Sequence, residues 1–241
     1  MNHVAARTLV MASLAALCAG AYAAETPPGD VPRVSYGLQL DTLRSGYDKE
    51  TCWVHSRAGA IPADPPIVVL TMQRLLLSGS DIFFALNEMR TDDLGRTWTG
   101  PVEHETLGRR NIEDGAVEVV CDFTPKWHAK TGKLLGTGHS AQYRDNKLVS
   151  VRRRWTAYAV YDPANRAWTP WQCLEMPDVP RFFNAGAGST QRVDLPDGDV
   201  LLPIYFKARE EKQNAVTVVR CRFNGQTLSY VEHGDELTIP V

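Results

Sequence analysis

The chain has 241 residues, of which 44% are hydrophobic and 22% are charged, and a length of this order suits one domain. Its formal net charge is −2 at pH 7, so it lacks the basic excess with which proteins bind nucleic acid. Beyond the N-terminus, no segment is long and apolar enough to suggest a membrane span. We therefore expect neither a nucleic-acid partner nor a membrane-spanning protein.

Residues 1–23 have the features of a secretory signal peptide. Arg7 gives the segment a positively charged start, and the apolar stretch 9–19 is too short to span a bilayer comfortably. Ala21-Tyr22-Ala23 supplies a small-x-small cleavage site. The sequence therefore predicts a secreted or periplasmic protein whose folded part is 24–241.

The cysteines and the glycine-rich segments give no metal or cofactor signature. Four cysteines lie beyond residue 23, namely Cys52, Cys121, Cys173 and Cys221. None forms a Cys-x-x-Cys pair, so no metal site is expected. There is neither a dinucleotide fingerprint nor a phosphate loop, so no cofactor is expected. The thiols could be buried in strands, or could form one or two disulfides in an oxidising compartment.

The remainder of the chain reads as β-structure. Glycine and proline are frequent (18 and 15), short apolar runs alternate with turn dipeptides, and long helical periodicity is absent. This pattern is typical of an all-β sandwich, barrel or propeller.

A hairpin turn is predicted at Thr91–Trp98, after the apolar run 82–86. Asp93 can fold its carboxylate back onto backbone N–H groups, as aspartates do in Asx turns. Gly95 supplies the positive φ that a tight turn often needs. Trp98 is large enough to pack the turn onto a core.

Similar units recur along the chain at long intervals. The first runs over 67–98, the second opens at residue 118 and the third near residue 187. Turns like the first recur at Asp162 and at 224–225, the latter an Asn-Gly hairpin signal. Each unit has about four strand-length runs, which indicates a propeller blade, whereas an immunoglobulin-like sandwich would turn at shorter intervals.

The turn also carries a family resemblance. Its residues match the pattern Ser/Thr-x-Asp-x-Gly-x-Thr-Trp through Thr91, Asp93, Gly95, Thr97 and Trp98. The stretch thus resembles the Asp-box, or BNR repeat, of sialidases (neuraminidases) and related β-propellers. In that family the box lies on outer turns far from the pocket, so it implies a fold and not a chemistry.

The resemblance implies a six-bladed propeller of four-stranded blades, of which about three are present here. Propellers close with roughly four to eight blades, because an open ring leaves sheet edges and core uncovered. We therefore expect 24–241 to be the N-terminal half of a longer propeller. The alternatives are that two copies assemble or that this count of blades is low.

The family also implies a set of functional residues. Three arginines hold the carboxylate of the sugar, because a guanidinium meets a carboxylate bidentately. An aspartate is the acid/base, and a tyrosine paired with a glutamate is the nucleophile. The later arginines, the tyrosine and its glutamate belong to the second half of the family fold, and none is assigned in this sequence.

Two of these roles have candidates. The family's first arginine lies in an Arg-Ile-Pro motif, and the nearest match is Arg57, separated from Ile61-Pro62 by three residues. Asp81 lies between this motif and the Asp-box, where the family places its acid/base. Gln73 is the alternative occupant of that position, and glutamine cannot donate a proton as a carboxylic acid does.

Other polar residues fit structural roles better. The histidines His55, His128 and His139 could reach a channel but share no metal-ligand spacing. Asp122 and Arg74 could flank a pocket, whereas the run 152–154 of three arginines is interpreted as the cap of a solvated strand end.

The sequence hypothesis is therefore a secreted sialidase-like glycoside hydrolase that removes a terminal acidic sugar, such as sialic acid, from a glycoconjugate. Arg57 would bind the sugar carboxylate and Asp81 would donate the proton. One alternative is a non-catalytic propeller that binds glycans or protein, since Asp-boxes occur in both. Another is a propeller hydrolase that uses two carboxylates on neutral sugars.

Overall fold

The computed structural model describes residues 35–79 and 81–238, so the expected signal peptide lies outside the described residues. The chain divides into two units, Met1–Asp41 and Thr42–Val241. The described part of the first, 35–41, contains no helix or strand. The sheets and the candidate site all belong to the second unit.

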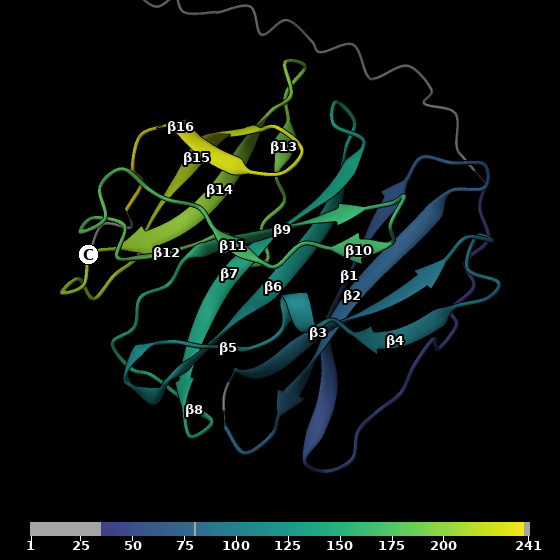
Figure 1. The fold of residues 1–241 in the computed structure, drawn as a ribbon, viewed down its shortest axis with the longest axis horizontal. Helices are drawn as coiled ribbons and strands as arrows, with labels where there is room; N and C mark the ends of the chain where they lie inside the picture. The colour runs from purple at the N-terminus through teal and green to yellow at the C-terminus, as the bar shows by residue number, and fades with distance from the viewer. Residues whose placement is uncertain (1–34, 80, 239–241) are drawn as a thin grey trace, which may run out of the picture. The chain divides into compact units, whose positions relative to one another are not determined.

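The described residues form three antiparallel sheets (Figure 1). The first has the order β1 (Thr51–Ile61), β2 (Ile67–Leu76), β3 (Ile82–Thr91), β4 (Thr99–Glu103). The second contains β5 (Arg110–Asn111), β6 (Val117–His128), β7 (Lys133–Arg144), β8 (Lys147–Leu148), β9 (Thr156–Asp162), β10 (Ala167–Trp168) and β11 (Gln172–Cys173). The third contains β12 (Asn184–Gly186), β13 (Val193–Asp194), β14 (Asp199–Lys207), β15 (Ala215–Phe223) and β16 (Leu228–His233). Short 3-10 turns at Glu105–Leu107 and Glu113–Gly115 connect the first two sheets.

Each sheet is built on a run of four antiparallel strands, as the repeated units predicted. The runs are β1-β2-β3-β4, β6-β7-β9-β10 and β12-β14-β15-β16. The sequence interpretation was wrong in detail for the first unit. The unit was expected to begin at residue 67, whereas strand β1 precedes it at Thr51–Ile61.

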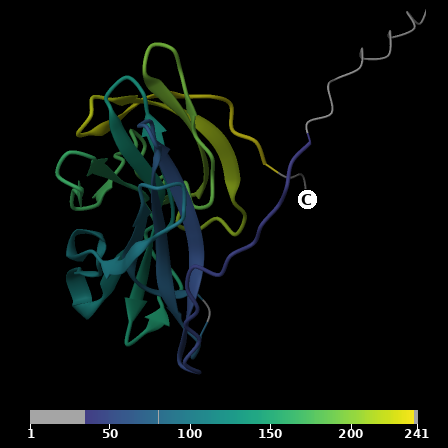
Figure 2. The ribbon, with the colours of Figure 1, turned by 90° about the vertical axis from the view of Figure 1, so that its right-hand side faces the viewer.

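Apolar side chains between neighbouring sheets form the core. Leu86 of the first sheet shares a buried cluster with Phe123 and Trp168 of the second, whose rings meet edge to face at 5.3 Å. A second cluster joins Tyr158 of the second sheet to Phe206 of the third. Figure 2 shows the strands of the first sheet running alongside those of the second.

The turn at Thr91–Trp98 has the predicted chemistry. The Asp93 carboxylate accepts hydrogen bonds from the Thr97 backbone N–H at 2.9 Å and from the Thr97 hydroxyl at 2.6 Å. Gly95 has φ of 83°, and its N–H donates to the Thr91 hydroxyl at 2.9 Å. Trp98 is only half-buried and joins none of the core clusters of the described residues.

Two further expectations concern disulfide bonds and membrane-spanning helices, and both can be compared with the described residues. The four cysteines beyond residue 23 are all unbridged, and each lies in a strand. This favours the interpretation of strand thiols over disulfides. Within 35–79 and 81–238, no helix has the length and apolar character that a membrane span requires.

Candidate functional site

Three non-glycine residues with left-handed backbone lie in or directly after strands of the three sheets. These residues are His55 in β1 (φ 56°), Asp122 in β6 (φ 52°) and Ser189 between β12 and β13 (φ 59°). The strand register shifts at the first two of these places. Such conformations are unfavourable outside glycine and gather at functional sites, so three of them mark a candidate site.

Side chains from all three sheets meet at this point. The Arg57 guanidinium donates to the Asp122 carboxylate at 3.2 Å and lies 2.8 Å from the Ser189 hydroxyl oxygen. Ser189 in turn donates to Asp122 at 2.8 Å. The Nη1 atom of Arg57 is buried and has no hydrogen-bond partner, which is an unmet donor of the kind that a ligand can satisfy.

Two histidines and a tyrosine complete the surroundings of Asp122. The Nδ1 atoms of His55 and His139 lie 3.3 and 3.8 Å from its carboxylate oxygens. The hydroxyl of Tyr205, from the third sheet, lies 3.2 Å from the His139 Nδ1 atom. Burial raises the pKa of Tyr205, so its phenol stays protonated and is not poised as a nucleophile.

The charge states of the two central groups follow from these contacts. Burial acts to raise the pKa of Asp122, but the Ser189 hydrogen bond and the charge of Arg57 help to hold it below its ordinary value. Burial and the charge of Arg154 lower the pKa of His139 to about 3. At neutral pH the site therefore holds an ionised Asp122 beside a neutral imidazole, and Asp122 is not a general acid there.

One group of side chains could approach a metal ion. Donor atoms of Cys121, Asp122 and His139 lie within 4.8 Å of one another. Burial and the nearby Asp122 carboxylate raise the pKa of the Cys121 thiol well above its ordinary value. A protonated thiol is a poor ligand, and Arg57 already pairs with the carboxylate, so the arrangement favours an anion over a cation.

Asp81 lies at the edge of this site. It is exposed in the β2–β3 connection, has φ of 56°, and its carbonyl accepts a hydrogen bond from the Tyr143 hydroxyl at 2.6 Å. Two residues later, the Phe83 ring lies 5.0 Å from the ring of His55, which faces Asp122. The structure therefore places Asp81 near the site, whereas the contacts of Arg57 go to Asp122 and Ser189.

Gln73 and Arg74 have structural surroundings. Gln73 is fully buried, and its amide donates to the carbonyls of Phe84 at 2.9 Å and Val120 at 2.8 Å, which joins the first two sheets. Arg74 pairs with Asp48 at 2.8 Å. The Gln73 amide nitrogen is therefore committed to the contact between the sheets.

The arginines at 152–154 do more than cap a solvated strand end. All three are half-buried in the connection between β7 and β9. Arg152 and Arg154 line a pocket of about 180 Å³ together with Lys207 and Arg209 from the end of β14 and the turn after it. The run of three arginines in the sequence was a signal for a basic site. The sequence did not show which other segment of the chain completes the lining of the pocket.

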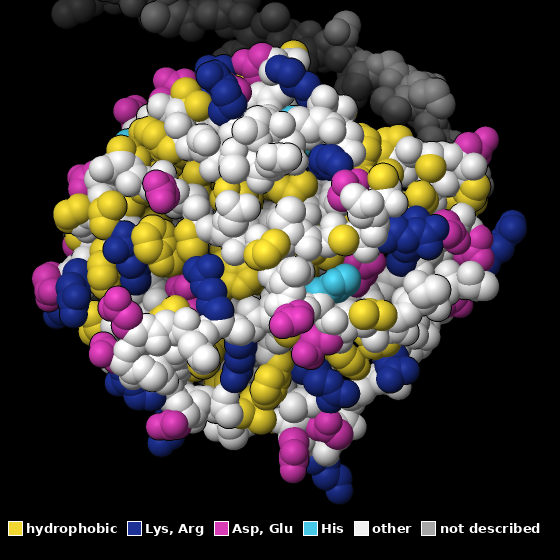
Figure 3. All heavy atoms as spheres, viewed as in Figure 1, with side chains coloured by type: hydrophobic (Ala, Val, Ile, Leu, Met, Phe, Trp, Pro, Cys, Tyr) yellow, Lys and Arg dark blue, Asp and Glu magenta, His cyan; other side chains and the backbone are white. Residues whose placement is uncertain are grey.

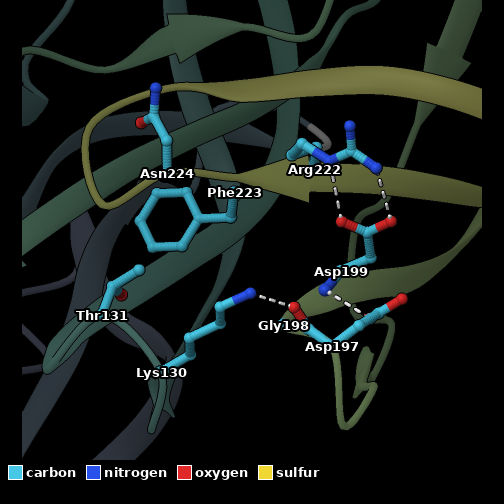
Figure 4. Close-up of a pocket in the computed structure, with 8 residues that line it drawn as sticks. All are labelled: Lys130, Thr131, Asp197, Gly198, Asp199, Arg222, Phe223 and Asn224. Atoms are coloured by element: carbon cyan, nitrogen blue, oxygen red, sulfur yellow. Dashed lines mark hydrogen bonds and ion pairs between the residues drawn. The ribbon is translucent and has the colours of Figure 1, made fainter.

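A larger hollow of about 460 Å³ lies among the hairpin turns at the other ends of the strands (Figure 4). Each of its charged groups has a hydrogen-bond partner in the protein. The Asp199 carboxylate accepts from Arg222 at 3.2 Å, and the Lys130 ammonium donates to the Asp197 carbonyl. Among the described residues, Lys130 bonds only a neutral carbonyl, but no charged group of this hollow has a buried atom without a hydrogen-bond partner, unlike Arg57 with its Nη1 atom, so the hollow is a weaker candidate site.

Comparisons with known proteins give a likeness of fold. No protein family and no curated protein matches the sequence. A solved structure named Hadza microbial sialidase Hz136 matches with a TM-score of 0.58 and 14% identity, over 76% of this chain. The match covers 38% of the length of that sialidase. The chain therefore has an all-β, sialidase-like fold.

Proposed function

We propose that this chain is part of an exported, sialidase-like β-propeller that binds the carboxylate of a terminal acidic sugar and cleaves its glycosidic bond. Arg57 carries the proposal, because its partly buried guanidinium has a buried, unpartnered Nη1 atom and contacts Asp122 of the second sheet and Ser189 of the β12–β13 connection. Asp122 and Ser189 hold its other nitrogen, so the remaining edge is preorganised for an oxyanion.

Asp81 is the proposed proton donor. In an antiparallel run of strands, alternate connections lie at opposite ends, so the β2–β3 connection lies away from the Thr91–Trp98 turn. The Tyr143 hydroxyl fixes the backbone of Asp81, which is an exposed residue. An exposed carboxyl on a fixed backbone can reach a leaving-group oxygen that enters from solvent.

We also propose that further blades complete the ring. Along β15, buried residues such as Val219 alternate with Val216 and Val218, which are 46% and 42% exposed. These two valines line an apolar pocket of about 330 Å³ on the outer face of the third sheet. The inner face packs on the second sheet as the second packs on the first, so a further sheet is the expected cover.

A non-catalytic glycan-binding propeller is the second candidate. The Tyr/Glu nucleophile pair has no assigned residues, and Tyr205 stays a neutral phenol. Binding by Arg57 requires none of these groups.

Turnover and binding distinguish the two candidates. Release of fluorophore from a sialoside should be measured for the chain and for Arg57→Ala and Asp81→Ala, with Arg96→Ala in the distant turn as control. An enzyme should lose turnover in both site variants, while Asp81→Ala keeps its affinity for free sialic acid. Binding without turnover in the wild type would favour the non-catalytic propeller. Neither binding nor turnover would contradict both candidates.

A further inference from the structure

The pocket between the second and third sheets is strongly basic. Its lining includes Arg152, Arg154, Lys207 and Arg209 together with the amides of Asn184 and Asn214, and it contains no carboxylate. Among the described residues, Arg152, Arg154 and Lys207 form no ion pair, and Arg209 reaches only the exposed Glu210 at 3.7 Å. The positive charges of Arg152 and Arg154 are therefore left without a carboxylate partner among the described residues.

Two observations show that the arginines have unmet donors and that their charges repel each other. The Nε atoms of Arg152 and Arg154 are buried and have no hydrogen-bond partner. Burial lowers the pKa of Arg152, and the charge of Arg154 adds to this effect. A bound oxyanion would accept hydrogen bonds from these donors and would also reduce the repulsion between the two guanidinium groups.

The backbone around the pocket is ordered by hydrogen bonds between the sheets. The N–H of Arg154 donates to the Phe183 carbonyl at 3.3 Å, and its carbonyl accepts from Ala185 at 3.0 Å. The Asn184 amide donates to the Arg152 carbonyl at 3.3 Å. The guanidinium of Arg154 also lies 5.0 Å above the ring of Tyr205. Arg154 is thus positioned before any ligand arrives.

The pocket adjoins the Arg57 site. The charge of Arg154 lowers the pKa of His139, which lies beside Asp122, and Tyr205 contacts both His139 and Arg154. We propose that this basic pocket binds a second oxyanion, a carboxylate or a sulfate ester, carried by the glycan. This inference rests on the proposed function, and it makes a saccharide with two neighbouring acidic groups the preferred substrate.

Inorganic sulfate is the first probe, because it tests the pocket independently of sugar recognition. Side-chain N–H signals of Arg152 and Arg154 should shift saturably as sulfate is added at constant ionic strength. Arg152→Gln and Lys207→Gln should each weaken the response of Arg154 about tenfold or more. Arg152→Lys keeps the charge and should retain binding, which controls for misfolding, as does the circular dichroism of each variant. A response that does not saturate, or that Arg96→Gln weakens equally, would overturn the pocket.

A saccharide with two acidic sugars is then compared with the corresponding single acidic sugar, and a sulfated sugar is the third ligand. The ligand that the wild type prefers identifies the second oxyanion, and Arg152→Gln should abolish that preference while the affinity for the single sugar stays unchanged. Equal affinity for all three ligands would contradict the substrate assignment. If sulfate saturates Arg154 but no saccharide binds, the basic pocket stands and the proposed function fails.

Discussion

The guanidinium of Arg57 and the carboxylate of Asp122 meet at 3.2 Å across two sheets, and both side chains are about four-fifths buried (21% and 18% exposed). Each group thereby makes the burial of the other tolerable, since an unpaired buried charge is costly. The same contact holds Arg57 in the orientation in which its second nitrogen can face a ligand. Stability and the proposed ligand binding are therefore both expected to depend on this ion pair.

The pair should appear as an energetic coupling. Asp122→Asn leaves Arg57 without a counterion and is expected to lower the free energy of unfolding by about 1–3 kcal/mol. Once Arg57→Gln is present, the same substitution should cost less, with a coupling of about 0.5–3 kcal/mol. Urea denaturation of the four proteins measures this, and Glu210→Gln on the exposed surface is the control. Strictly additive effects would show that the contact contributes no coupling.

The turn at Thr91–Trp98 should make stability depend on acid. The hydrogen bonds from the Thr97 hydroxyl and N–H lower the pKa of Asp93 to about 2. The ionised form is thus favoured in the folded state, and its contribution is fully present above the unfolded pKa of about 3.9. It is lost as the pH falls through about 2. The stability difference between wild type and Asp93→Ala should be constant above about pH 5 and shrink below pH 4.

Its neighbour Asp92 provides the matched control. Asp92 is exposed and accepts no hydrogen bond among the described residues. Thermal unfolding of Asp92→Ala should follow the wild type across the same pH range. A difference for Asp93→Ala that persists unchanged at pH 2 would contradict the assigned role of the carboxylate.

Local chemistry made this turn and most strands predictable. Asp93, Gly95 and Thr97 specify the turn through contacts within a few residues of sequence, so no knowledge of the rest of the chain is needed. Strand β1 was missed because its burial is irregular, with a register shift between Val54 and Arg57. Because the alternation of buried and exposed residues is interrupted, the sequence of this strand shows no clear two-residue period.

The candidate site was predictable only in part, because its contacts are long-range. Arg57 was identified from the family motif, but Asp122 and Ser189 lie 65 and 132 residues away along the chain. Their pairing depends on which strands become neighbours. The left-handed conformation at Asp122 and Ser189 likewise has no local sequence signal, since neither residue is a glycine.

Close packing between β6 and β7 should forbid a side chain at Gly136. A Cβ atom there would lie 1.9 Å from the Phe123 ring, which is buried in the cluster between the first two sheets. Gly136→Ala is therefore expected to lower the free energy of unfolding by about 1–3 kcal/mol through overpacking. At Gly234 the nearest atom would be 4.0 Å away, so Gly234→Ala is the matched control. Equal stability of the two variants in urea would show that Phe123 moves aside freely.

His139 should make the folded state sensitive to acid over a different range. Burial and the charge of Arg154 lower the pKa of its imidazole to about 3 in the folded protein, whereas the unfolded value is about 6.5. Between these two values the unfolded chain binds a proton that the folded chain does not. Stability must therefore fall as the pH drops from about 6.5 toward 3, with a slope of up to about 1.4 kcal/mol per pH unit from this group.

Replacing the imidazole should remove that dependence. His139→Gln is expected to be less stable than wild type at pH 7, because the contact with Tyr205 changes, but to lose less stability on acidification. His233→Gln, on the edge strand β16, should keep the slope of the wild type. Imidazole NMR shifts provide a direct measurement, since the His139 ring should still be neutral at pH 5. A ring that protonates between pH 5 and 7 would mean that the site is more hydrated than its contacts indicate, and that Asp122 faces a cation on that side.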